Sequence, residues 1–170
     1  MSQRASAFAP SGVVTLTTDF GHKDPFVGVM KGRLVGRFPA VVMIDLTHEI
    51  LAHWPAEAGF WLARAFRYFP AGTVHVAVVD PGVGSARDLA VIEAEGHVFL
   101  APDNGLLAAV VEAVETATLR RVEPRVLERI GIGVPSATFH GREVFAPLAA
   151  EIAAGRLAPD VLGPQVAELI

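Results

Sequence analysis

Aspartate follows four apolar segments of the chain, at the point where each segment ends. These residues are Asp19, Asp45, Asp80 and Asp103. If the segments are strands of an open α/β sheet, ligands bind in the crevice beyond the carboxyl ends, where several carboxylates can form one acidic site. Such a site suits a divalent cation, a polyol such as ribose, or a cationic substrate. The alternative is that each aspartate only caps a helix or makes a turn.

The elements that must position these residues alternate between short β-branched segments and helical patterns. Asp24 is expected to cap the first helix, with Pro25 at its first position and its end near residue 38. Further helices are expected from Pro55, over residues 105–113 and over residues 143–154. The expected strands cover residues 13–18, 41–44, 73–79, 89–93, 97–101 and 117–122, and a Glu95-Gly96 turn joins two of them into a hairpin. This order predicts an α/β fold, a three-layer α/β/α sandwich with a mostly parallel mixed sheet.

The length and composition indicate one domain. The chain has 170 residues, and we expect a flexible tail over residues 1–12 and a single α/β domain over residues 13–170. Hydrophobic residues make up 52% of the chain and charged residues 19%, with a mean hydropathy of +0.44. Two explanations fit so apolar a composition: a sheet buried on both faces, and an apolar surface that binds a partner.

Several functional classes are excluded by composition. The chain has 14 basic and 18 acidic residues and no basic cluster, so no nucleic-acid partner is expected. It has no cysteine, which excludes disulfides and thiolate metal sites and agrees with a cytoplasmic location. No apolar run is long enough to cross a membrane, and the first residues lack the apolar region of a signal peptide, so no membrane partner is expected.

Five groups of motifs occur in a specific order over nearly the whole chain. They are TDFG at 18–21 with DPFVG at 24–28, DLTHE at 45–49, FPAGTV at 69–74 running into VDPGVGS at 79–85 and then Arg87, PDNGLL at 102–107, and SATFHGREVFAP at 136–147. Together they resemble the amino-terminal domain of S-adenosyl-L-methionine (SAM) hydrolases. This family is also called the SAM hydroxide adenosyltransferases and is related to fluorinase and chlorinase.

The resemblance implies hydrolysis of SAM to adenosine and L-methionine. It implies that Asp80, Arg87 and His140 handle the water, and because the fluorinase relatives differ at the aspartate and histidine positions, a hydrolase is expected rather than a halogenase. It implies a ribose-binding role for Asp19 and places Phe139 and Gly141 at the nucleophile site. The remaining expected substrate-binding residues are Phe20, Asp24, His53 and Asn104.

The chemistry implied by the resemblance needs no metal or cofactor. The sulfonium makes the methionine sulfur a neutral leaving group, so the nucleophile is the difficulty. Asp80 would align the water with C5′, Arg87 would stabilise its hydroxide character, and His140 would carry the proton away. Three other histidines, His48, His75 and His97, are expected to be structural, and Lys31 is expected to lie on a solvated helix face.

The chain departs from the resemblance in two ways. The segment at residues 50–54 (ILAHW) replaces one expected to be richer in proline. The resemblance therefore does not identify which residue of this segment contacts the substrate. Family members also continue into a smaller β-barrel domain, and their active site lies between one subunit's amino-terminal domain and a neighbour's barrel within a homotrimer. The chain ends about where that barrel would begin. Two alternatives therefore stay open: a non-catalytic nucleoside- or SAM-binding module or inactive fragment, and a carboxylate-rich metal phosphohydrolase.

Overall fold

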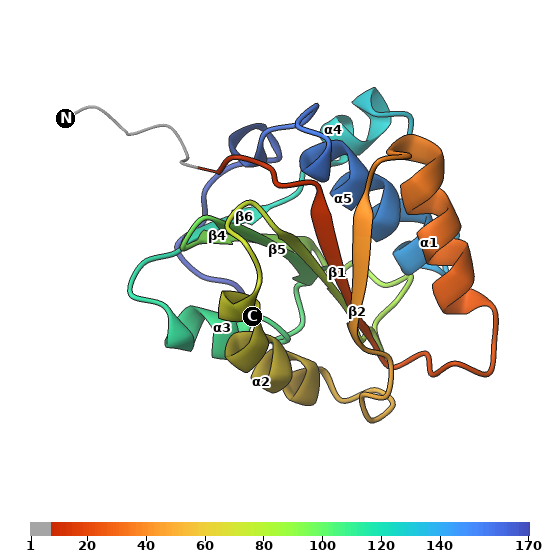
Figure 1. Cartoon of the computed structure of the whole chain (residues 1–170), viewed down its shortest axis with the longest axis horizontal. Coiled ribbons are helices and arrows are strands. Elements are labelled where there is room, and N and C mark those ends of the chain that lie inside the picture. Colours follow the sequence, from red (N-terminus) through yellow and green to blue (C-terminus); the bar gives the residue numbers. More distant parts are fainter. Residues whose placement is uncertain (1–7) are drawn as a thin grey trace.

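The structure is a computed structural model that describes residues 8–170, arranged as one sheet with helices on both faces (Figure 1). The strands are β1 (Val13–Thr18), β2 (Val42–Thr47), β3 (Val74–Val78), β4 (Leu89–Ala94), β5 (His97–Pro102) and β6 (Thr118–Arg121). The helices are α1 (Phe26–Arg37), α2 (Pro55–Ala65), α3 (Ala108–Ala113), α4 (Pro124–Arg129) and α5 (Ala146–Ala153), with short helical turns at Phe66–Tyr68, Gly141–Phe145 and Pro159–Val161.

The sheet has the strand order β2-β1-β3-β5-β4-β6. The first four strands in this order are parallel, whereas β4 runs antiparallel to both β5 and β6. The mixed, mostly parallel sheet predicted from the sequence is confirmed, including the hairpin of β4 and β5. Because β2, β1, β3 and β5 are neighbours and parallel, the segments that follow them leave the same edge of the sheet.

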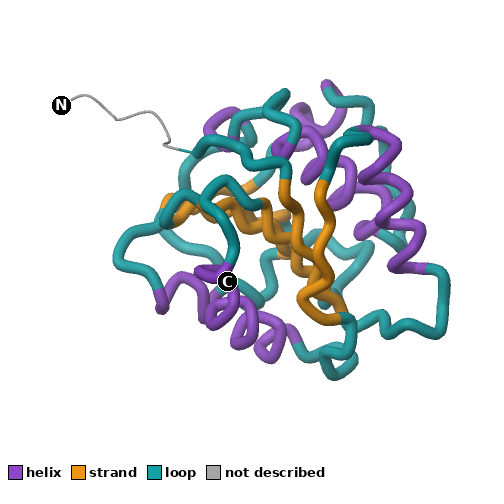
Figure 2. Tube along the Cα trace, in the orientation of Figure 1, coloured by secondary structure: helices purple, strands orange, loops and turns teal. Residues whose placement is uncertain are grey.

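Two clusters of buried apolar side chains lie between the sheet and its helices. Helices on both faces of the sheet give the predicted three layers (Figure 2). α1 and α5 pack together over one face, and α2 and α3 pack together over the other. Every residue of β3 and β5 is buried, as expected for central strands covered on both faces. The apolar composition is therefore explained in part by the doubly covered sheet.

Several element boundaries differ from the sequence expectations. α1 begins at Phe26 after Pro25, and no side chain caps it, so the expected Asp24 cap is wrong. β2 extends to Thr47 and so contains Asp45, which was expected to follow it. The last predicted helix is a π-helical turn followed by α5, and α4 was not predicted.

The expected tail is described only in part. Residues 1–7 lie outside the described residues. In residues 8–12, the backbone N–H of Ser11 donates to the carbonyl of Gly72 (3.0 Å), and the carbonyl of Gly12 accepts from Val42 (2.9 Å). Across residues 8–170, no helix is both long and apolar enough to cross a membrane.

Two buried histidines connect the central strands β3 and β5, in agreement with the structural role expected of them. His75 Nε2 lies 3.1 Å from His97 Nδ1, and His75 Nδ1 lies 2.7 Å from the Thr15 hydroxyl. The ring of His75 also stacks on Phe99. Burial, with a smaller contribution from His97, lowers the pKa of His75 to about 3.

This depressed pKa predicts a loss of stability in mild acid. In the unfolded chain His75 binds a proton below pH ~6.5, whereas in the folded chain it stays neutral down to about pH 3. Folding stability therefore falls as the pH falls through this window. Between pH 7.5 and 5.0 the contribution of His75 to the free energy of unfolding should drop by about 2 kcal/mol. Urea unfolding at both pH values should show this drop, and His75→Gln should reduce it. An equal pH dependence in wild type and variant would contradict the assignment.

Candidate active site

A cavity of about 340 Å³ opens beyond the carboxyl ends of β1 and β3. It is lined by residues from the turn after β1, the start of α1, the loop before α2, the loop after β3 and the segment before α5. The lining residues are Asp19, Phe20, Phe26, Ala52, His53, Val78, Asp80, Val83, Thr138, Phe139, His140 and Gly141. Seven of the ten predicted site residues belong to this set, which brings together segments more than a hundred residues apart.

Asp80, Arg87 and His140 form a connected cluster at this cavity. Arg87 Nε donates to Asp80 Oδ1 and Oδ2, each at 3.0 Å, and Arg87 Nη2 also contacts Oδ2. Arg87 Nη2 further donates to His140 Nδ1 at 2.8 Å. The side chains of Arg87 and Asp80 are only 9% and 5% exposed, so the ion pair is largely removed from water. Arg87 does not line the cavity but holds two residues that do.

The contact with Arg87 fixes the tautomer of His140. A guanidinium only donates hydrogen bonds, so Nδ1 of His140 accepts and Nε2 of the neutral ring carries the proton. Burial, reinforced by the charge of Arg87, lowers the pKa of His140 below its ordinary value. His140 is therefore a neutral donor from Nε2, and it can take up a proton at Nδ1 only if the contact with Arg87 breaks.

Asp19 lies at the end of β1 and is held by the loop before α2. Its Oδ2 accepts a hydrogen bond from the backbone N–H of His53 at 3.0 Å. Beside it, Phe20, Phe26 and Phe139 pack edge to face, with ring centroids 5.2–6.1 Å apart. The cavity thus combines a carboxylate with an aromatic wall, which suits a ligand that has both hydroxyl groups and an apolar ring.

Besides Arg87, two of the ten predicted residues lie away from the cavity wall. Asp24 is exposed in the turn before α1. Asn104 stabilises its own loop, because its Nδ2 donates to the carbonyl of Val79 (2.9 Å) and its Oδ1 accepts from the N–H of Leu106 (3.2 Å). Five lining residues were not predicted as site residues, although all of them lie in or beside the quoted motifs or the divergent segment: Phe26, Ala52, Val78, Val83 and Thr138.

The four strand-end aspartates do not form one acidic site. Asp45 pairs with Lys31 at 2.6 Å, and Asp103 pairs with Arg121 at 3.0 Å. Asp103 also accepts a hydrogen bond from the backbone N–H of Ile170 at 2.8 Å. Only Asp19 and Asp80 reach the cavity. Within residues 8–170, no group of three or more histidine, aspartate and glutamate side chains is arranged to hold a metal ion.

Comparison with known sequences identifies the family of this chain. The family model of the SAM hydroxide adenosyltransferase N-terminal domain matches residues 14–163. The chain belongs to this family.

The relatives of this SAM hydroxide adenosyltransferase domain include curated hydrolases. A protein of Thermus thermophilus named (R)-S-adenosyl-L-methionine hydrolase is 42% identical over 157 residues, which cover 90% of this chain and 61% of the relative. A protein of the same name from Salinispora tropica is also 42% identical and covers 93% of this chain and 59% of the relative. A fluorinase of Actinoplanes is more distant at 28% identity, covering 84% of this chain and 55% of the relative. The chain thus spans about three fifths of the length of the curated hydrolases it matches.

A solved structure supports the fold. An uncharacterized conserved protein from Thermotoga maritima superimposes with a TM-score of 0.85 at 37% identity, over 92% of this chain and 60% of that chain. The α/β architecture of the SAM hydroxide adenosyltransferase domain is therefore shared with a structure determined for a relative.

A glycine in the loop after β3 brings two site segments of the domain together. Gly84 has φ +78°, and a Cβ there would lie 2.4 Å from the carbonyl oxygen of Ala137. Gly84→Ala should therefore separate the Asp80–Arg87 loop from the His140 segment and lower the free energy of unfolding by about 2 kcal/mol. Gly82→Ala is the matched control, because the tightest contact of a Cβ there is the movable Ser85 hydroxyl at 3.2 Å, and its other neighbours, side-chain atoms of Arg87 and Asp80, lie at an ordinary 3.8–3.9 Å. Equal losses in denaturant titrations of both variants would contradict this argument.

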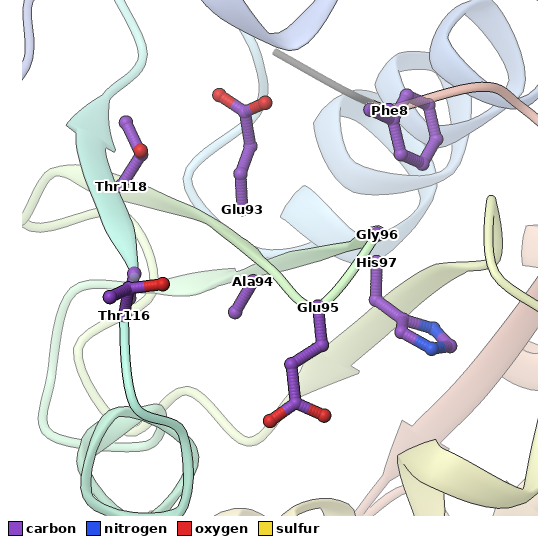
Figure 3. A pocket seen from close by; sticks show the side chains of 9 residues that line it. Phe8, Glu93, Ala94, Glu95, Gly96, His97, Thr116 and Thr118 are labelled. Atoms are coloured by element: carbon purple, nitrogen blue, oxygen red, sulfur yellow. The ribbon is translucent and has the colours of Figure 1, made fainter. Parts of the chain in front are cut away.

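A second cavity of about 230 Å³ lies at the opposite end of β5, around the turn between β4 and β5 (Figure 3). Its charged residues are already paired: Glu95 with Arg67 at 2.6 Å, and Glu93 with Arg120 at 3.4 Å. His97, which also lines it, is in contact with His75. This cavity shares none of its lining residues with the site at Asp80, and we assign no chemistry to it.

Proposed function

We propose that this domain binds S-adenosyl-L-methionine and hydrolyses it to adenosine and L-methionine. The observation that carries the proposal is the contact of Arg87 with both Asp80 and His140 beside a cavity that also contains Asp19. The curated relatives named SAM hydrolases, at 42% identity, support the same reaction. The phosphohydrolase alternative has less support, because only two of the four strand-end carboxylates reach the cavity.

In the proposed reaction, the oxygen of a water molecule attacks C5′ of the ribose. The C5′–S bond breaks, and its electron pair leaves with the sulfur of methionine, which thereby loses its positive charge. The water gives up one proton, which finally reaches solvent. The sulfur departs as a neutral thioether, so the leaving group requires neither a general acid nor a metal, and we propose that no cofactor takes part.

The protein groups act on the water in this proposal. Asp80 accepts a hydrogen bond from the water and orients its lone pair toward C5′. The Arg87 guanidinium beside Asp80 and the Nε2–H of His140 favour hydroxide character as the proton leaves. Since Nδ1 of His140 is occupied by Arg87, a donor role fits the ring better than the proton-accepting role expected from the sequence. Asp19 accepts from the ribose, and Phe20 and Phe139 exclude water around it.

The assay for this proposal is adenosine formation from SAM, followed by chromatography, together with adenosine binding by calorimetry. Adenosine release that exceeds the spontaneous rate supports the hydrolase. Adenosine binding without release would instead indicate the non-catalytic nucleoside-binding module.

We also propose that the protein acts as a homotrimer in the cytoplasm. Large apolar side chains are exposed along β2 and around the start of α2, which fits an interface core low in charge. The absence of cysteine agrees with the compartment. Light scattering at micromolar concentration should give about three times the monomer mass of 18.0 kDa. A monomeric mass would contradict the trimer.

A further inference from the structure

His53 has a backbone conformation that few residues other than glycine adopt. Its φ is 62°, in the left-handed region. It is the third residue of a turn closed by a hydrogen bond from the N–H of Trp54 to the carbonyl of Leu51, at 3.1 Å. Turns with positive φ at this position usually have glycine or asparagine there. Such a conformation persists only where its surroundings hold it, and these conformations concentrate at functional sites.

Both ends of this turn are fixed. At its start, the backbone N–H of Leu51 donates to Glu57 Oε2 at 2.8 Å, which ties the turn to the first part of α2. At its end, Pro55 opens α2, and a residue before proline is restricted to extended conformations, as Trp54 is with φ −113° and ψ 82°. The direction of the His53 N–H is therefore set by its neighbours on both sides.

The His53 N–H points at the carboxylate of Asp19. It donates to Oδ2 at 3.0 Å, whereas Oδ1 has no hydrogen bond from any described residue. Asp19 and His53 both line the 340 Å³ cavity. One oxygen of the carboxylate is thus held by backbone, and the other is left available to a ligand hydroxyl.

We propose that His53 is a positioning residue, whose left-handed backbone fixes the Asp19 carboxylate for a ribose hydroxyl. This inference rests on the proposed function, because ribose recognition by Asp19 is part of it. A carboxylate already held in one orientation loses less side-chain freedom when the nucleoside binds. In this proposal the selectivity for ligands with ribose hydroxyls over ligands without them depends on the backbone of residue 53 more than on its imidazole ring. The role of the divergent segment at residues 50–54 is then to orient the Asp19 carboxylate.

Three variants separate the backbone from the ring. His53→Asn removes the imidazole but keeps the N–H in a residue that accepts positive φ. His53→Val keeps the N–H but disfavours positive φ, because valine is β-branched. His53→Ala is a milder second variant for the case in which the valine variant does not fold, as judged by thermal unfolding. The probes are adenosine and 2′,3′-dideoxyadenosine, which lacks both ribose hydroxyls, and calorimetry gives the Kd of each.

The decisive readout is the ratio of the two dissociation constants. Wild type should bind adenosine at least tenfold more tightly than the dideoxy compound, and His53→Asn should keep most of this ratio. His53→Val should reduce this ratio to about twofold. When Asp19→Asn is already present, adding His53→Val should cause no further reduction of the ratio. An equal loss in the asparagine and valine variants, or a full ratio in the valine variant, would overturn the inference alone. Failure of wild type to bind adenosine would overturn the proposed function and this inference with it.

Discussion

Arg87→Gln is expected to lower the free energy of unfolding by about 3 kcal/mol, because it leaves the Asp80 carboxylate buried without its cation. The pair is held at three points and is less than a tenth exposed, so water cannot replace the lost contacts. The same change removes the donor to His140 Nδ1. Chemical denaturation followed by circular dichroism measures the loss.

The double variant Asp80→Asn/Arg87→Gln is the matched control. With both charges removed, no buried carboxylate stays unpaired, so part of the lost stability should return. Arg67→Gln provides a second comparison, since Arg67 pairs with Glu95 at the surface and its loss should be much smaller. If Arg87→Gln were no more destabilising than Arg67→Gln, the Asp80–Arg87 pair would not hold the site together.

Asp80→Asn is expected to reduce adenosine release from SAM by about 1000-fold while changing the Kd for adenosine by less than about threefold. In the proposed mechanism Asp80 contacts the water and not the nucleoside, so its loss affects the reaction and not the binding. Turnover under saturating SAM and calorimetric binding of adenosine give the two numbers. Circular dichroism at the assay temperature shows whether the variant is folded.

The reciprocal variant is Asp19→Asn. It keeps the side-chain size at the end of β1 but weakens the acceptor for the ribose, so the Kd for adenosine should rise by about tenfold or more. If Asp80→Asn mainly lowers turnover and Asp19→Asn mainly raises the Kd for adenosine, then Asp80 acts in the reaction and Asp19 in binding. Equal loss of binding and turnover in Asp80→Asn would show that its assignment to the water is wrong.

The position of the site could be predicted from the sequence because the topology is regular. Asp19 and Asp80 each follow an apolar strand, and strands of one sheet that run parallel release their loops at one edge. His140 was placed there by its motif alone, since no strand precedes it. The predicted starts of β1 at Val13 and of α2 at Pro55 were also confirmed. Both could be predicted because proline favours the first turn of a helix and β-branched residues favour strands.

What could not be predicted depends on contacts between distant segments. Asp45 and Asp103 carry the same strand-end signal as Asp80, but Lys31 and Arg121 neutralise them, and no local pattern reports such pairing. Asn104 lies within a quoted motif, yet it bonds to its own loop. The left-handed backbone of His53 is likewise invisible in the sequence, where glycine would have been the usual signal.

The position of β2 has a consequence for the behaviour of the protein at high concentration. Among the described residues this strand pairs only with β1, and Val42 and Ile44 on it are 52% and 38% exposed. An apolar strand with one free edge is a template for pairing with other chains, and it invites aggregation when nothing covers it. Asp45 and its partner Lys31 place two charged groups at this apolar segment, and charged side chains on an edge strand oppose pairing with other chains. The ion pair of Lys31 with Asp45 is therefore expected to limit aggregation of the chain during expression and refolding.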